Sequence, residues 1–217
     1  MPKVNDEYLA AKKDFILECA EEILKEKPLY MVTMRDIINK AGFSHGVIYR
    51  YYANLSEIYV DLINKHTTCF ILEQRIDTIL CSESPEKTIL SDCLIAIGEF
   101  LAELLRSAIG KTFFELLVLY SSEFVKRTII FPRLKFRQSL EYAQNRILEF
   151  TVASIEKGVF QPQIPIRSIM LFVNVFFDGI AQNAVYKATE GDARGSGPAI
   201  DIREMYRTLA NAVINFL

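Results

Sequence analysis

The feature that most limits what this chain can fold into is its scarcity of residues that interrupt helices. Its 217 residues include only 9 Gly and 7 Pro, and these fall in clusters separated by long stretches that contain neither. Between the clusters, Leu, Ile, Glu and Lys are frequent, and these residues favour helices over a strand-rich sandwich. We therefore expect an all-α protein, because the sequence shows neither a strand pattern nor an internal repeat.

Local signals divide the first part of the chain into three helices. Thr33 and Asp36 have the spacing of a capping box, which predicts that a short helix begins there. Gly42 suits the left-handed position that ends such a helix, and Ser44 is expected to cap the next one. The predicted helices comprise residues 5–25, 34–41 and 45–51.

The rest of the chain is also predicted to be helical. A long helix is expected to begin at Asn54 and to run to about Leu80. Ser84 followed by Pro85 predicts another helix start, and Gly158 suits a helix end. The further predicted helices comprise residues 85–105, 113–125, 132–157, 167–189 and 201–217.

Charge and cysteine usage restrict the function less than the helical pattern does. The formal net charge is −2, and residues 1–55 hold eight basic and eight acidic side chains, so any affinity for DNA must come from where the charges lie. The cysteines lack CxxC spacing and nearby His partners, so we expect a reduced, cytoplasmic protein with no metal and no cofactor. A redox sensor is the alternative. The cysteines are Cys19, Cys69, Cys81 and Cys93.

The sequence also predicts that no segment enters a membrane. The N-terminal residues lack the apolar run of a signal peptide. The most apolar stretch, residues 166–180, is shorter than a membrane span and contains Asn174 and Asp178.

The tight turn Ala41–Ser44 between the second and third short helices favours a helix-turn-helix. In that motif the third helix enters the major groove of DNA. His45 would lie where side chains meet base edges, and Gly46 permits close approach of the backbone. The segment Tyr49–Tyr52, including Arg50, would offer hydroxyl and guanidinium donors to phosphates. The same periodicity also fits a plain three-helix core in which the tyrosines fill gaps.

A family resemblance distinguishes these two interpretations. The run Val32–Ile37, followed by Ala41–Tyr52, resembles the signature of the TetR family of regulators, and the spacing agrees through Glu57. The resemblance implies a DNA-binding domain over residues 1–53 and a helical ligand-binding and dimerisation domain over residues 54–217. It also implies a homodimeric repressor that leaves an inverted-repeat DNA operator when a small hydrophobic or aromatic effector binds.

The resemblance carries roles over by position. Contact with DNA bases is implied for Arg35, His45, Gly46 and Val47, and in some members of the family also for the position of Tyr49. Contact with DNA phosphates is implied for Thr33, Ser44, Tyr49 and Tyr51. Arg50 is a further candidate for phosphate contact because its guanidinium group is a cationic donor. One position departs from the family: Leu55 stands where a phosphate-binding Lys is usual, which either weakens the grip on DNA or places Leu55 in the core.

The predicted larger domain is rich in aromatic side chains, most of which we expect to be core. Helical bundles also form pockets between facing helices, and aromatic linings suit flat or apolar molecules. The candidate ligand-binding residues are Phe100, Phe113, Tyr120, Phe172, Asn174, Phe176 and Asp178. The basic stretch 126–137 is predicted to be a solvated connector, with an anionic effector or a contact to acids of the first helix as alternatives.

The last two predicted helices are expected to supply the dimer interface, because the helix 167–189 is apolar nearly all round. Val175 and Val213 are representative residues of that interface. Two rival classes of function are an enzyme acting on an apolar substrate and a protein-binding helical adaptor. No nucleophile–base pair, metal spacing or phosphate loop supports catalysis, so we predict no enzymatic activity and no catalytic residue.

Overall fold

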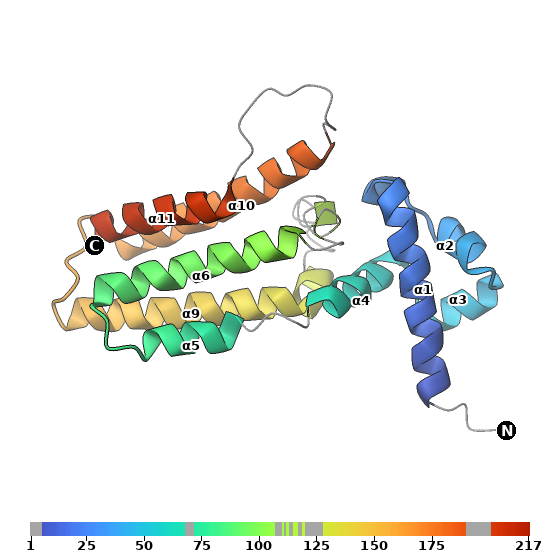
Figure 1. Cartoon of the computed structure of the whole chain (residues 1–217), viewed down its shortest axis with the longest axis horizontal. Coiled ribbons are helices and arrows are strands. Elements are labelled where there is room, and N and C mark those ends of the chain that lie inside the picture. The colour runs from blue at the N-terminus through green and yellow to red at the C-terminus, as the bar shows by residue number, and fades with distance from the viewer. Residues whose placement is uncertain are drawn as a thin grey trace.

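The computed structural model describes residues 6–67, 72–106, 128–189 and 201–217, with five further positions between 110 and 119. The described residues form helices and turns and contain no β-strand. Figure 1 shows mostly long helices gathered at one end of the molecule and, at the other, a compact group of short helices packed beside one long helix. The predictions for Phe113 and Tyr120, and for most of the helix 113–125, lie outside the described residues.

The compact end begins the chain. It comprises α1 (Asp6–Glu26), η1 (Leu29–Met31), α2 (Met34–Ala41) and α3 (His45–Tyr51), and α4 (Leu55–Thr67) leads away from it. The long end comprises α5 (Leu72–Leu80), α6 (Glu86–Arg106), η2 (Phe131–Arg133), α9 (Lys135–Glu156), α10 (Ile166–Thr189) and α11 (Ile202–Phe216). None of the described helices is long and apolar enough to cross a membrane.

The predicted boundaries of α2 are confirmed. The Thr33 hydroxyl oxygen accepts from the Asp36 backbone N–H, and the Asp36 carboxylate accepts from the Thr33 N–H in return. Gly42 has a φ of 66°, in the left-handed region that favours glycine, and its N–H donates to the Ile38 carbonyl. Ser44 lies at the start of α3 as expected, but its side chain makes no capping hydrogen bond.

The single helix predicted from Asn54 to about Leu80 is wrong in its length. The structure contains two helices here, α4 ending at Thr67 and α5 beginning at Leu72. The start is as predicted, because the Asn54 side chain accepts from the Glu57 N–H.

The long helices pack around a close contact between α6 and α11. A methyl group added at Gly98 of α6 would lie 2.4 Å from the Cβ of Tyr206 on α11. Phe176 of α10 meets the same tyrosine edge-on, with the ring centroids 5.5 Å apart. Small size at position 98 therefore sets how near the two helices come, and Tyr206 is almost fully buried between them.

The Asn64 side chain ties α4 to the long end. The Nδ2 group of Asn64 donates to the Arg133 carbonyl oxygen, and its Oδ1 accepts from the Lys135 N–H, both at 2.8 Å. Lys135 is the first residue of α9, so the two bonds fix α4 against the start of that helix. On the other side, α4 packs against α1, where His66 contacts the Glu21 carboxylate at 3.0 Å.

The Gly98–Tyr206 contact predicts a contrast between two glycine substitutions. Gly98→Ala should destabilise the protein by about 1–3 kcal/mol, because the added methyl group overpacks the α6–α11 seam. Gly46→Ala is the control: its methyl group meets open space, so it should be neutral or stabilising by up to about 1 kcal/mol. Urea unfolding of both variants measures the difference, and equal effects would contradict the packing argument.

The capping box predicts a pH-dependent contribution to stability. Hydrogen bonds from Lys27 and Thr33 lower the pKa of Asp36 from 3.8 to about 2. A lowered folded-state pKa stabilises the fold above the ordinary value, and the gain disappears as the pH falls toward the folded value. The advantage of the wild type over Asp36→Asn in urea unfolding should therefore shrink between pH 6 and pH 3, by roughly half. A constant advantage would show that the charge of Asp36 contributes nothing.

Candidate functional site

α3 is held in place mainly by Ile48 and presents most of its other side chains to solvent. Ile48 is fully buried, and it packs in the same core as Ile37 and Ala41 of α2. A seven-residue helix cannot be stable alone, so this burial is what positions it. The exposed residues of α3 are His45, Gly46, Val47, Tyr49 and Arg50.

The exposed side chains of α3 form a surface with hydrogen-bonding capacity. The rings of His45 and Tyr49 stack one turn apart, with centroids 6.4 Å from each other. Gly46, between them in sequence, has no side chain to hold a neighbour away, and a methyl group there would meet nothing within 4 Å. This helix can therefore approach another surface closely along its N-terminal half.

Arg35 and Arg50 are the cations of α2 and α3 that carry no ion pair with another described residue. Arg35 and Arg50 are both exposed to solvent. The nearby lysines are occupied, since Lys27 pairs with Asp36 at 2.8 Å and Lys40 pairs with Glu22 at 2.7 Å. The hydroxyl of Thr33 is exposed but donates to the Asp36 carboxylate, so contact with an anion would require it to turn.

Two aromatic side chains and Leu55 lie inward of this surface. Tyr52 is buried, and its hydroxyl donates to the Asp61 carboxylate, so the expectation that it faces phosphates is wrong. Burial and the Asp61 charge raise its pKa. Tyr51 is half-buried against the core. Leu55 also packs against the core, which accounts for an apolar residue at that position.

A cavity of about 180 Å³ lies between α6, α9, α10 and α11. Its walls are mostly aliphatic, as at Ile97 of α6 and Ile169 of α10. The polar side chains that line it are Gln144, Asn145, Thr151, Asn174 and Tyr206. Thr151 is already bonded within α9, where its hydroxyl donates to the Ile147 carbonyl.

Of the candidate ligand-binding residues that the structure describes, one, Asn174, lines this cavity. Phe100 is buried in the core, Phe172 packs edge-on against Phe216, and Asp178 is exposed on α10. Sequence reasoning missed Gln144 and Asn145, although two adjacent carboxamides on a helix that faces the core were a visible signal.

For the basic stretch 126–137, the described residues do not show the alternative contact with acids of the first helix. Arg133 lies 3.9 Å from Glu57 of α4, and Arg137 pairs with Glu141 on its own helix. Glu21 and Glu22 of α1 instead pair within the compact end, with His66 and Lys40 respectively. Lys126 and Arg127 lie outside the described residues.

Comparisons with known proteins agree with the helix-turn-helix geometry. Residues 16–62, which span α1 to α4, match the model of the bacterial regulatory proteins of the tetR family. The chain is 27% identical over 215 residues to the uncharacterized HTH-type transcriptional regulator YfiR of Bacillus subtilis (strain 168), covering 97% of this chain and 98% of the relative.

Solved structures share the fold along almost the whole chain. FadR from Bacillus subtilis, solved with stearoyl-CoA, has a TM-score of 0.58 at 15% identity, covering 94% of this chain and 98% of its own. PfmR from Thermus thermophilus, a TetR family regulator, has a TM-score of 0.57 at 18% identity, covering 93% and 98%. The chain therefore has an N-terminal unit that matches the tetR family of bacterial regulatory proteins, and it shares its all-helical fold with solved regulators of that family.

Proposed function

We propose that this regulator is a homodimeric repressor that binds an inverted-repeat operator and leaves it when a small apolar or aromatic effector binds. The observation that carries the proposal is the exposed face of α3, whose hydrogen-bonding groups are turned to solvent while Ile48 is buried in the core. In a helix-turn-helix this face enters the major groove. Residues 1–53 would form the DNA-binding domain and residues 54–217 the domain for effector binding and dimerisation.

Within this proposal the exposed residues divide into two sets. His45, Gly46 and Val47 at the start of α3 would meet base edges, together with Arg35 of α2 and Tyr49. Phosphate contacts would come from Thr33, Ser44, Tyr49, Arg50 and Tyr51. Because the neighbouring lysines are held in ion pairs, hydrogen bonds would contribute more to DNA affinity than counterion release does.

The proposed dimer interface is the outer face of α10. Leu171 and Val175, four residues apart, are 63% and 61% exposed, which is unusual for aliphatic side chains on a long helix. The opposite side of α10 lines the cavity through Ile169, Val173 and Phe177. The apolar residues of this helix are thus divided between two faces, and burial of the outer one needs a second copy.

Release from DNA would follow from a shift between two states of the dimer. FadR of Bacillus subtilis was solved with stearoyl-CoA, and FadR of Thermus thermophilus with lauroyl-CoA, so proteins with this fold bind ligands with apolar chains. In this chain the cavity would receive the effector. α9 forms one wall of the cavity, and its first residue is hydrogen-bonded by Asn64 of α4. A movement of α9 at the cavity could therefore be transmitted through α4 to the compact end.

The division of the α3 surface predicts different effects for two substitutions, measured on an operator selected from random duplexes. Arg50→Ala should weaken operator and random DNA alike and lower the slope of log affinity against log salt by about 0.9 for each phosphate left without its cation. His45→Ala should relax preference at one or two base pairs, costing up to about 1–3 kcal/mol on the operator alone. Lys25→Ala, an exposed lysine paired with Glu21 on α1, is the control and should change neither quantity.

If the chain selects no sequence at all, the repressor proposal fails. If His45→Ala weakens binding equally on operator and random DNA, His45 does not read bases.

The proposed interface predicts that Val175→Asp produces monomers and abolishes operator binding, because a carboxylate would be buried against an apolar partner face. Val152→Asp on α9 makes the same change at an exposed position away from α10 and should remain dimeric. Sedimentation equilibrium measures both. Val213, also expected at the interface, is only 4% exposed within the protomer, so a charge there would test folding instead. A wild-type protein that sediments as a monomer contradicts the proposal.

A further inference from the structure

The cavity between α6, α9, α10 and α11 is lined without any charged side chain among the described residues. Its polar groups are hydroxyls and carboxamides. The carboxamides of Gln144, Asn145 and Asn174 make no hydrogen bond with another residue in the part of the chain that the structure describes. Gln144 and Asn174 are exposed to solvent as well as lining the cavity, so they lie where it opens. These amide groups can donate to and accept from a ligand without bringing a charge.

The absence of charge from this lining reflects how α9 is oriented. Residues Gln144, Leu148 and Thr151, at positions i, i+4 and i+7, line the cavity. Residues Tyr142, Arg146 and Glu149 repeat the same spacing two residues out of step, which places them on the opposite face of the helix.

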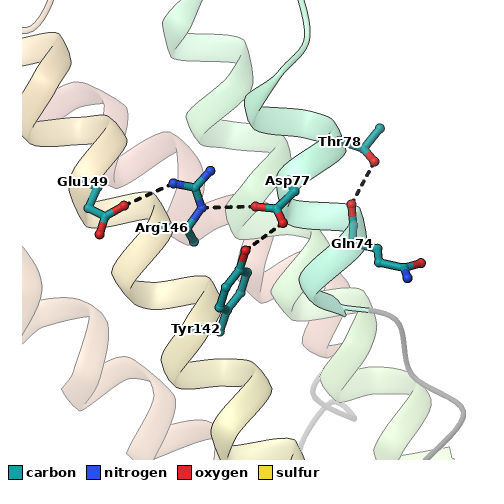
Figure 2. Close-up of polar contacts among 6 residues, drawn as sticks. All are labelled: Gln74, Asp77, Thr78, Tyr142, Arg146 and Glu149. Carbon is teal, nitrogen blue, oxygen red and sulfur yellow. Dashed lines mark hydrogen bonds and ion pairs between the residues drawn. The ribbon is translucent and has the colours of Figure 1, made fainter.

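Figure 2 shows Tyr142 and Arg146 of this face directed toward Asp77 of α5, whereas Glu149 contacts Arg146 within α9. The Arg146 guanidinium donates to Asp77 and to Glu149, both at 3.1 Å, and the Tyr142 hydroxyl donates to Asp77 at 2.7 Å. The hydrogen bonds from Tyr142 and Arg146 lower the pKa of Asp77, so the network retains its charges. Arg146, the basic residue of α9 nearest in sequence to the cavity residues, is thereby held away from them.

We propose that the cavity binds an uncharged ligand, with an apolar body inside and an amide-, carbonyl- or hydroxyl-bearing edge against the carboxamides at its mouth. The inference rests on the proposed function, because it names the chemical class of the effector. A buried carboxylate would lose its hydration and find no cation in the described lining. By the same argument, a free acid or a coenzyme A thioester is disfavoured as a ligand of this cavity.

Two probes of equal shape test the charge preference. The probes are 2-naphthamide and 2-naphthoate, which share the same rings and differ in whether the substituent is neutral or anionic. The chain contains no Trp, so naphthalene emission can be followed without indole emission. The wild-type full chain should bind the amide at least about tenfold more tightly than the carboxylate.

Two variants test whether the probes bind in this cavity. Gln144→Lys adds a cation at the cavity and should lower the ratio of the two dissociation constants by about tenfold or more. Gln138→Lys makes the same change on the same helix, at a residue that does not line the cavity, and should leave the ratio unchanged. Asn145→Lys provides a second cavity variant if Gln144→Lys does not fold, as judged by circular dichroism.

Three results would overturn the inference. They are equal or tighter binding of the carboxylate by the wild type, no binding of either probe up to its solubility limit, and equal ratios in the cavity and control variants. The same preparations are assayed for binding to the selected operator. Loss of specific DNA binding would overturn the regulator proposal alone, whereas an unfavourable probe ratio with intact DNA binding would overturn only the ligand class.

Discussion

The position of α3 depends on burying Ile48, because a helix this short has too few internal hydrogen bonds to persist in water. Ile48 is fully excluded from solvent, and so are Ile37 of α2 and Leu62 of α4. α4 therefore forms part of the core on which α3 rests. Asn64 ties α4 to the start of α9, and the Glu115 carboxylate accepts from the Leu29 N–H at 2.9 Å. The orientation of α3 is thus linked to the larger part of the chain through the packing of α4 and through hydrogen bonds at both α4 and η1.

The distribution of charge explains how an N-terminal region proposed to bind DNA can have a balanced net charge. Several of its described lysines serve the structure: Lys27 and Lys40 join α2 to neighbouring elements, and Lys65 joins α4 to Asp14 of α1. These exposed ion pairs each add little stability, but they remove cations from the surface that would meet phosphate. Arg35 and Arg50 escape this pairing among the described residues, so two available cations lie on or beside the recognition helix.

The sequence predicted most of what is local. Thr33, Asp36 and Gly42 gave the limits of α2 because capping and left-handed turns depend on neighbouring residues. It did not predict that Tyr52 is buried against Asp61, because that contact depends on how α3 meets α4. For the cavity, periodicity identified α10 as apolar, yet it could not tell which of its aromatic rings packs on α11 and which residues face inward. Helical spacing places Gln144 and Arg146 on opposite faces of α9, but only the tertiary arrangement shows which of the two faces lines the cavity.

α10 joins the two proposed activities of the long end. Ile169, Val173 and Phe177 face the cavity, whereas Leu171 and Val175 face outward, and the two sets are separated only by the width of the helix. Its described packing is chiefly with α11, which includes the edge-on contacts of Phe172 and Phe176. A rigid helix cannot move on one face and remain still on the other. A ligand that displaced the inner face would therefore displace the outer one, and in a dimer built on that face it would alter the separation of the two α3 helices. Binding at an uncharged cavity would then reach DNA without any charge change at either site, through packing alone.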